Sequence, residues 1–128
     1  MNAYTRPGIN IITKDDISSQ DKIFKKVCEC FGYEPEQVRK YDKLRIREFV
    51  VIRQVSMVMM RTYLKSTIDT SKPLSFAKCG AYFEKDHATA IHAHKTVLNL
   101  LDTDKHFRQL ILPLFNYKRP KKWESYYI

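Results

Sequence analysis

Apolar residues recur every three or four positions through most of this chain, and this spacing constrains the fold more than any other feature. The first segment that follows it contains Ile23, Phe24, Val27, Cys28 and Phe31. Such spacing is typical of an amphipathic helix that buries one face. Ser18 and Ser19 precede the segment as helix N-caps, and Gly32 follows it as a C-terminal glycine.

Further helices are expected along the middle of the chain. Pro35 opens the short segment PEQVRKY, because proline suits the first turn of a helix. A longer helix is predicted from about Arg47 to Leu64. Its apolar stripe contains Phe49, Ile52, Val55, Met59 and Tyr63. The polar segment KSTIDTSKP, which ends in Pro73, is predicted to be a loop.

The C-terminal half contains three more helix signals. Ser75 can cap a short helix, SFAKCGAYF, and Asp86 can cap a longer helix that ends near Leu101. The residues that we expect this longer helix to bury are Ile91, His94, Val97, Leu98 and Leu101. Asp102 is predicted to cap a last helix, whose end Pro113 weakens. One side of that helix is lined by Phe107, Leu110, Ile111 and Leu114.

The pattern as a whole predicts an all-α domain of five or six helices over residues 18–115. No β-hairpin signal appears, and the only strand-like run lies in the first 13 residues. Residues 1–17 are predicted to form an N-terminal arm. The basic and aromatic segment 116–128 is expected to be either a second arm that contacts the ligand of the domain or a disordered end. A chain of 128 residues suits one such domain.

The charge of the chain favours a polyanionic partner. Lysine and arginine total 23 against 14 acidic residues, which gives a formal net charge of +9. For a small basic domain, nucleic acid is the commonest such partner. The excess is concentrated in residues 39–65, where eight basic residues face two acidic ones. This basic cluster contains Arg39, Lys40, Lys43, Arg45, Arg47, Arg53, Arg61 and Lys65.

Several other classes of protein are disfavoured. The three glycines, Gly8, Gly32 and Gly80, fit neither of the common phosphate-binding loops, so no nucleotide cofactor is expected. The cysteine count is three, without a disulfide framework or signal peptide, which favours a reducing, cytoplasmic setting. No apolar run reaches the roughly 18 residues that a membrane span needs. No residue pattern predicts an enzyme.

The histidine-containing stretch DHATAIHAHK, residues 86–95, does not predict a metal or catalytic site. Two zinc ligands on one helix are normally four residues apart, whereas His87 and His92 are five apart. No cysteine pair with zinc spacing supports them, and no nucleophile is evident nearby. His92 and His94 are expected to be packing or surface residues.

The segment 75–101 instead predicts a helix-turn-helix. In this motif the second helix places its N-terminal residues in the major groove of DNA. Those positions must carry polar or short side chains, and Asp86, His87, Ala88 and Thr89 meet this requirement. Histidine and threonine offer hydrogen-bonding groups to base edges, and alanine can contact a thymine methyl.

The same segment resembles the C-terminal DNA-binding domain of the bacterial replication initiator DnaA. That family's signature runs roughly I-G-x-x-F-G-x-D-H-x-T-V-x-H-A. The residues that match it are Gly80, Phe83, Asp86, His87, Thr89, His92 and Ala93. Upstream, REFVVIRQVSM at 47–57 and VCECFGYEPEQV at 27–38 are similar to further segments of that domain. The likeness covers about residues 18–101 and implies a fold of the DnaA C-terminal, Trp-repressor-like type.

The resemblance also implies which residues bind double-stranded DNA. Residues 86–89 would face the bases of the major groove, with Lys85 in the turn before them. Arg53 would correspond to an arginine that reaches the minor groove, and Arg45 and Arg47 would belong to a basic loop. The family's ATPase domain is not matched, so we expect a stand-alone DNA-binding protein without a cofactor, which acts in replication or transcription control of a bacterial or phage genome.

The sequence departs from the family at several positions. Ala88 stands where the family usually has a hydroxyl residue, Glu84 replaces a turn glycine, and Ile52 replaces a proline. The loop at 65–73 is longer than the family's. An alternative function therefore stays open, in which the same helical fold serves as a protein-interaction or assembly module.

Overall fold

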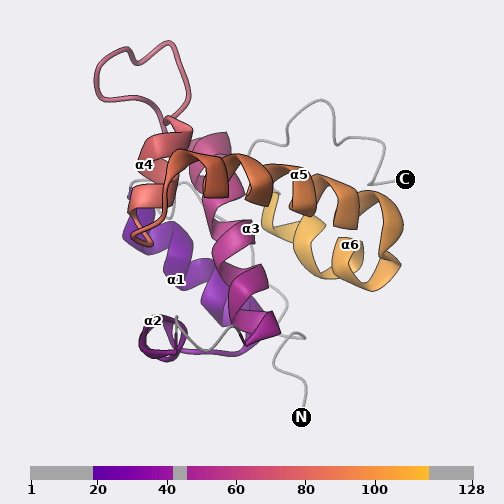
Figure 1. Cartoon of the computed structure of the whole chain (residues 1–128). Helices are drawn as coiled ribbons and strands as arrows, with labels where there is room; N and C mark the ends of the chain where they lie inside the picture. The colour runs from indigo at the N-terminus through magenta and orange to yellow at the C-terminus, as the bar shows by residue number, and fades with distance from the viewer. Residues whose placement is uncertain (1–18, 42–45, 116–128) are drawn as a thin grey trace.

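The computed structural model of the chain describes residues 19–41 and 46–115. The predicted arm at 1–17, the tail at 116–128 and the candidate residue Arg45 lie outside these described residues. Within them the fold is all-α, as the sequence predicts (Figure 1). The elements are α1 (Gln20–Phe31), α2 (Pro35–Lys40), α3 (Arg47–Tyr63), α4 (Phe76–Ala81), α5 (His87–Thr103), α6 (Lys105–Ile111) and the 3-10 helix η4 (Leu112–Phe115).

Most helix boundaries follow from the capping residues that the sequence contains. The Ser19 hydroxyl accepts from the Lys22 N–H at the start of α1, and Gly32 ends that helix in the left-handed conformation, with φ 83°. The Ser75 hydroxyl likewise accepts from the Lys78 N–H at the start of α4. These side chains satisfy backbone groups that a helix end leaves without intrahelical partners. The predicted helices at both positions are confirmed.

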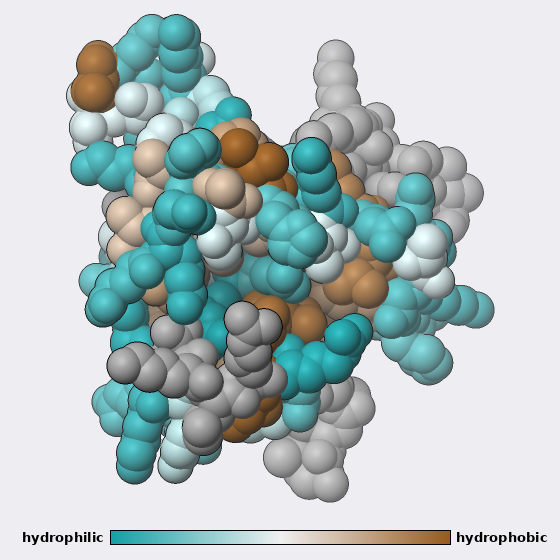
Figure 2. Space-filling view, viewed as in Figure 1, coloured by the Kyte–Doolittle hydropathy of each residue, from teal (hydrophilic) through white to brown (hydrophobic). Residues whose placement is uncertain are grey.

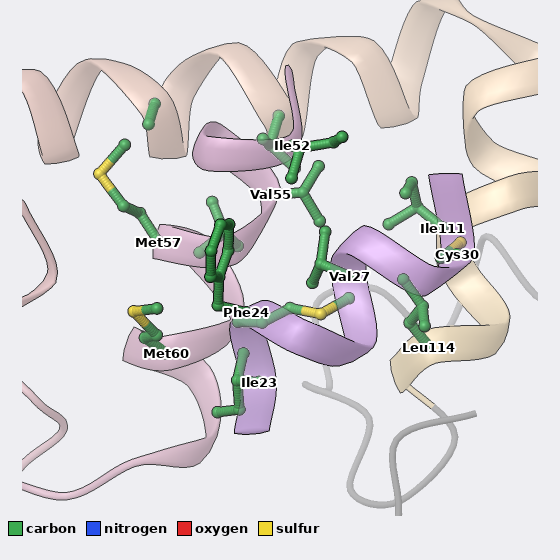
Figure 3. Close-up of a cluster of buried hydrophobic side chains, with 14 of the residues drawn as sticks. Ile23, Phe24, Val27, Cys30, Ile52, Val55, Met57, Met60, Ile111 and Leu114 are labelled. Carbon is green, nitrogen blue, oxygen red and sulfur yellow. The ribbon is translucent and has the colours of Figure 1, made fainter. Parts of the chain in front are cut away.

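The hydrophobic core lies where α1 and α3 meet the C-terminal helices. Figure 3 shows side chains from α1, among them Phe24 and Val27, packed against Ile52 and Val55 of α3, with Ile111 and Leu114 closing one side. All six side chains are at most 1% exposed. Burial of this kind is the main stabilising contribution for a domain of this size.

Cys28 and Cys30 of α1 belong to the same core. Burial raises the pKa of the Cys28 and Cys30 thiols to about 12, so both stay protonated at neutral pH. The Cys30 thiol donates a hydrogen bond to the Leu110 carbonyl oxygen at 3.7 Å, which links α1 to α6. None of the described helices is both long and apolar enough to span a membrane.

The predicted cap of the last helix is wrong by two residues. Asp104, not Asp102, caps α6, and its carboxylate accepts from the Phe107 N–H at 3.0 Å. The longer helix α5 continues through Thr103 because Arg108 reaches back from α6 to its last carbonyls. The Arg108 guanidinium donates to the carbonyl oxygens of Leu101 at 2.7 Å and Asp102 at 3.0 Å.

The buried face of α5 also differs from the prediction. Its fully buried residues are Ala90, Ala93, Val97 and Leu101. Three residues expected on this face, Ile91, His94 and Leu98, are only half-buried. The face is rotated because α5 packs on both α3 and α4 (Figure 1). Alanines on the contact line let helix backbones approach closely, whereas larger side chains fit only on its flanks.

Candidate nucleic-acid interface

The turn between α4 and α5 depends on a close approach at Gly80. A Cβ atom on Gly80 would lie 2.5 Å from the Asp86 carbonyl oxygen and 2.9 Å from that of Lys85. The Gly80 carbonyl oxygen accepts from the N–H groups of Phe83 and Lys85, each at 2.9 Å. Only a glycine lets the end of α4 and the start of α5 meet this tightly.

The start of α5 is capped and exposed. The Asp86 carboxylate accepts from the Thr89 N–H at 2.9 Å and from the Thr89 hydroxyl at 2.8 Å. These two hydrogen bonds hold the pKa of Asp86 below its usual value. His87, Ala88 and Thr89 are exposed, whereas Ala90 is 2% exposed and packs in the core. We call residues 87–89 the α5 start; its side chains face outward from a fixed backbone.

Aromatic contacts hold this helix pair on α1. The Phe83 ring meets the Phe24 ring edge-on at a centroid distance of 5.1 Å. The Tyr82 hydroxyl donates a hydrogen bond to the Asp21 carboxylate, and burial together with this bond raises the Tyr82 pKa above its usual range. The Gln20 amide adds a hydrogen bond to the Lys78 carbonyl oxygen at 3.3 Å. The α5 start is thus presented by a rigid support.

Arg53, which the resemblance assigns to a minor-groove contact, has a largely buried side chain. It lies in the second turn of α3, is only 7% exposed, and donates to the Val38 carbonyl oxygen of α2 at 3.5 Å. The cause is its position on the same face of α3 as Phe49 and Ile52, both of which are buried. A contact between Arg53 and DNA stays a prediction.

Two more arginines of the basic cluster also contact the body of the protein. The Arg61 guanidinium donates to the Leu74 carbonyl oxygen at 2.8 Å and lies 3.8 Å from the centroid of the Phe76 ring. Arg39 lies over the rings of Phe24 and Tyr82, at 5.0 Å and 4.7 Å. Cation–π contacts of this kind stabilise the fold. Part of the positive charge that the sequence suggests for DNA therefore serves packing.

Other basic residues of this region are better placed for a ligand. Arg47, the first residue of α3, is exposed, and Lys85 is half-buried in the turn next to the α5 start. Lys78 is exposed on α4. Lys78 is absent from the residues predicted to bind DNA, although its place on the first helix of a helix-turn-helix, which crosses the DNA backbone, is a usable sequence signal.

Comparison with known proteins identifies the family of this helix pair. The family described as the bacterial dnaA protein helix-turn-helix matches residues 20–97. The chain belongs to this DnaA helix-turn-helix family. The predicted family, the helical fold and the DNA-binding class of domain are thereby confirmed.

Full-length DnaA proteins are similar to this chain over most of its length. The chromosomal replication initiator protein DnaA of Bacteroides thetaiotaomicron is 37% identical over 89 residues, which cover 69% of this chain and 17% of the relative. The protein of the same name from Flavobacterium psychrophilum is 36% identical over 94 residues, or 73% of this chain and 18% of the relative. The matched segment thus spans less than a fifth of these relatives. The search of solved structures found no significant match.

The departure at Glu84 from the DnaA signature has a structural consequence. Glu84 has a φ of 58°, the left-handed conformation in which glycine is favoured, and no other non-glycine residue described in the chain has a positive φ. The turn thus keeps the backbone geometry that suits a glycine at this position and bears a steric cost of about 1–2 kcal/mol. Ala88, the other departure in this region, is exposed and presents only a methyl group.

His92 and His94 are surface and packing residues, as predicted. His92 is exposed, and its Nε2 lies 3.4 Å from the Thr96 hydroxyl one turn later. His94 is half-buried and meets the Phe76 ring edge-on at 5.9 Å. Among the described residues, no three histidine, cysteine or acidic side chains come together as a metal site.

Proposed function

We propose that this chain binds double-stranded DNA with a sequence preference, through the α5 start placed in the major groove. The observation that carries the proposal is the abrupt change in burial along α5. His87, Ala88 and Thr89 are exposed, and Ala90 directly after them is 2% exposed. In a helix-turn-helix the N-terminal residues of the second helix contact base edges. Their exposure in a DnaA-family helix pair supports this role.

Each residue of the α5 start has a distinct part in the proposal. His87 donates or accepts a hydrogen bond at a base edge, and Ala88 packs on a thymine methyl. The Thr89 hydroxyl donates to Asp86, so its remaining acceptor capacity and its methyl group are available to DNA. Asp86 acts chiefly as the cap that fixes this geometry, since its carboxylate already accepts two hydrogen bonds.

Phosphate contacts position the protein in this proposal. Lys78 on α4 and Lys85 in the turn supply positive charge within the helix pair, and Arg47 at the start of α3 and Arg45 would add to it. Such contacts give affinity and orientation without selecting a sequence. The net charge of +9 supports a polyanionic ligand.

We further infer that the process served is replication or transcription control of a bacterial or phage genome. The relatives named chromosomal replication initiator proteins support this class of process. A duplex ligand would place the protein at the nucleoid, or in the host cytoplasm for a phage protein. The proposal involves no catalytic step, nucleotide or membrane.

Selection of binding sites from a random duplex library at physiological salt tests the proposal. We expect one short consensus, with affinity for it falling steeply between about 50 and 200 mM salt as counterions are released. Enrichment of no consensus, together with a flat salt response, would contradict DNA binding. Capture of a stable protein complex through the α5 start in that case would support the protein-interaction alternative.

A further inference from the structure

The loop between α3 and α4, residues 65–73, projects from the body of the molecule beside α4 (Figure 1). It is a structured loop. Lys65 and Pro73 form an antiparallel bridge at its base. The Ser66 N–H donates to the Lys72 carbonyl oxygen at 3.0 Å, and the Leu74 N–H donates to the Leu64 carbonyl oxygen at 2.9 Å. The base of the loop is therefore closed like a short hairpin.

Polar side chains also fix the tip of the loop. The Ser66 hydroxyl accepts from the N–H groups of Ile68 and Asp69, at 3.2 and 3.4 Å. The Asp69 carboxylate accepts from the Ser71 N–H at 3.0 Å and from the Ser71 hydroxyl at 2.6 Å. The acidic side chain of the loop is thus engaged within the loop. Its conformation is preorganised, which lowers the entropic cost of binding.

Ile68 at this tip is 96% exposed, the most exposed large hydrophobic residue among those described. Figure 2 shows the projecting loop as hydrophilic with one isolated hydrophobic residue. One isoleucine among threonines and serines cannot form the apolar centre of a protein interface, which needs on the order of 20 residues a side. A single isoleucine is sufficient as a wedge between two stacked base pairs.

The position of the loop agrees with a DNA ligand. The first helix of a helix-turn-helix crosses the DNA backbone while the second occupies the major groove. The turn follows the C-terminal end of α4, and the loop precedes its N-terminal end. The loop therefore leads directly into the N-terminal end of α4, the helix that crosses the DNA backbone in this motif. Lys65 and Lys72, both exposed at the base of the loop, supply charge for phosphates.

We propose that the 65–73 loop is a second DNA contact, which inserts Ile68 into the minor groove that flanks the sequence recognised by the α5 start. The inference rests on the proposed DNA binding and extends it to a separate element. It implies that the bound site is longer than the recognised box. It also implies a local unstacking of bases at the flanking step, since an inserted apolar side chain separates them.

The test uses the full chain and two duplexes, one limited to the selected box and one with about ten more base pairs on each side. Wild-type protein should bind the longer duplex about tenfold more tightly, and Ile68→Ser should lose this gain while keeping its affinity for the short duplex. Ile68→Leu, which keeps an apolar tip, should restore the gain. Lys65→Gln and Lys72→Gln should each lower the salt slope on the longer duplex by about 1.

A fluorescent adenine analogue in the flank provides a second readout. Its emission should rise on binding of wild-type protein, because the base is unstacked, and should not rise with Ile68→Ser. Equal affinity of wild type and Ile68→Ser for the longer duplex, or equal losses on both duplexes, would overturn the loop contact alone. A wild type that binds neither duplex would overturn the proposed function and this inference together. Self-association that Ile68→Ser abolishes, with DNA binding unchanged, would assign the loop to contacts between copies instead.

Discussion

The sequence suggests DNA contacts for both the α5 start and the basic cluster of residues 39–65, yet the two regions differ in how far their side chains are exposed. His87, Ala88 and Thr89 are exposed on a capped helix end. In the basic cluster, Arg53 is buried against α2, and Arg61 holds the segment that leads into α4. A motif that specifies a backbone geometry therefore locates surface residues better than a count of charges does. Long basic side chains can use their stems and guanidinium groups in packing.

The largest effect on stability is expected for Arg53. Arg53→Ala should lower the free energy of unfolding by about 2–3 kcal/mol, because it leaves the Val38 carbonyl without this charged donor and opens space beside the core. Arg47→Ala, on the same helix but at an exposed position, is the matched control and should change stability by less than about 0.5 kcal/mol. Urea unfolding of the two variants measures the difference. An unchanged stability of Arg53→Ala with weakened specific DNA binding would mean that Arg53 leaves Val38 to contact DNA.

Gly80 gives the next largest effect. Gly80→Ala should destabilise the protein by about 2 kcal/mol, because the added methyl would overlap the Asp86 carbonyl oxygen at 2.5 Å. Duplex affinity should fall with it, since the turn that sets the α5 start must shift. Glu84→Gly in the same turn is the control and should keep or raise the melting temperature, because it relieves a positive φ. A Gly80→Ala variant with wild-type stability and affinity would show that the turn does not constrain α5.

Much of this fold follows from local rules that the sequence displays. Ser19, Gly32, Ser75 and Asp86 mark helix ends through contacts within a few residues, so their roles are predictable. The local pattern predicts Asp102 as the cap in place of Asp104, because the deciding contact is tertiary. Arg108 satisfies the last carbonyls of α5, and nothing in the local sequence indicates that contact.

In the candidate site, too, features set by the local sequence are predictable and features set by tertiary contacts are not. Exposure of the α5 start follows from the cap at Asp86 and the family signature, both local in sequence. Burial of Arg53 depends on where α2 packs against α3, a contact between residues 15 positions apart. Position 53 directly follows Ile52 of the predicted apolar stripe, which suggests partial burial. The residue type suggests exposure instead, because a charged residue is almost never fully buried unless it is paired. The partner at Val38 is a backbone carbonyl, and no sequence pattern reveals that contact.

A smaller effect is expected at the cap itself. Asp86→Ala should lower stability at neutral pH by less than Gly80→Ala does, because the Thr89 N–H loses its acceptor. The pKa of Asp86 is lowered in the folded protein, so its ionised form contributes stability above the unfolded-state pKa of about 4. This contribution is lost as the pH falls through the folded-state pKa. Thermal melts between neutral and acidic pH should show the difference in melting temperature between wild type and Asp86→Ala narrowing on acidification.

Asp86→Asn, which keeps an oxygen acceptor, is the control and should retain most of the cap at neutral pH. A difference in melting temperature between wild type and Asp86→Ala that stays constant at all pH values would contradict this account.

The α5 start should show the smallest effect on stability and the clearest effect on recognition. His87→Ala should change the free energy of unfolding by less than about 0.5 kcal/mol, because the side chain is exposed. Thr89→Ala removes a hydroxyl that donates to Asp86 but leaves the capped N–H in place, so its cost should stay below that of Asp86→Ala. The stability of both variants is read from the same thermal melts.

A paired titration of wild type, His87→Ala and Thr89→Ala on the selected duplex and on a scrambled duplex tests the central claim most directly. If the α5 start contacts bases, each substitution should lower the preference for the selected duplex by about 1–3 kcal/mol, while affinity for the scrambled duplex is unchanged. Full discrimination by both variants, with melting temperatures equal to that of the wild type, would contradict base recognition by this helix.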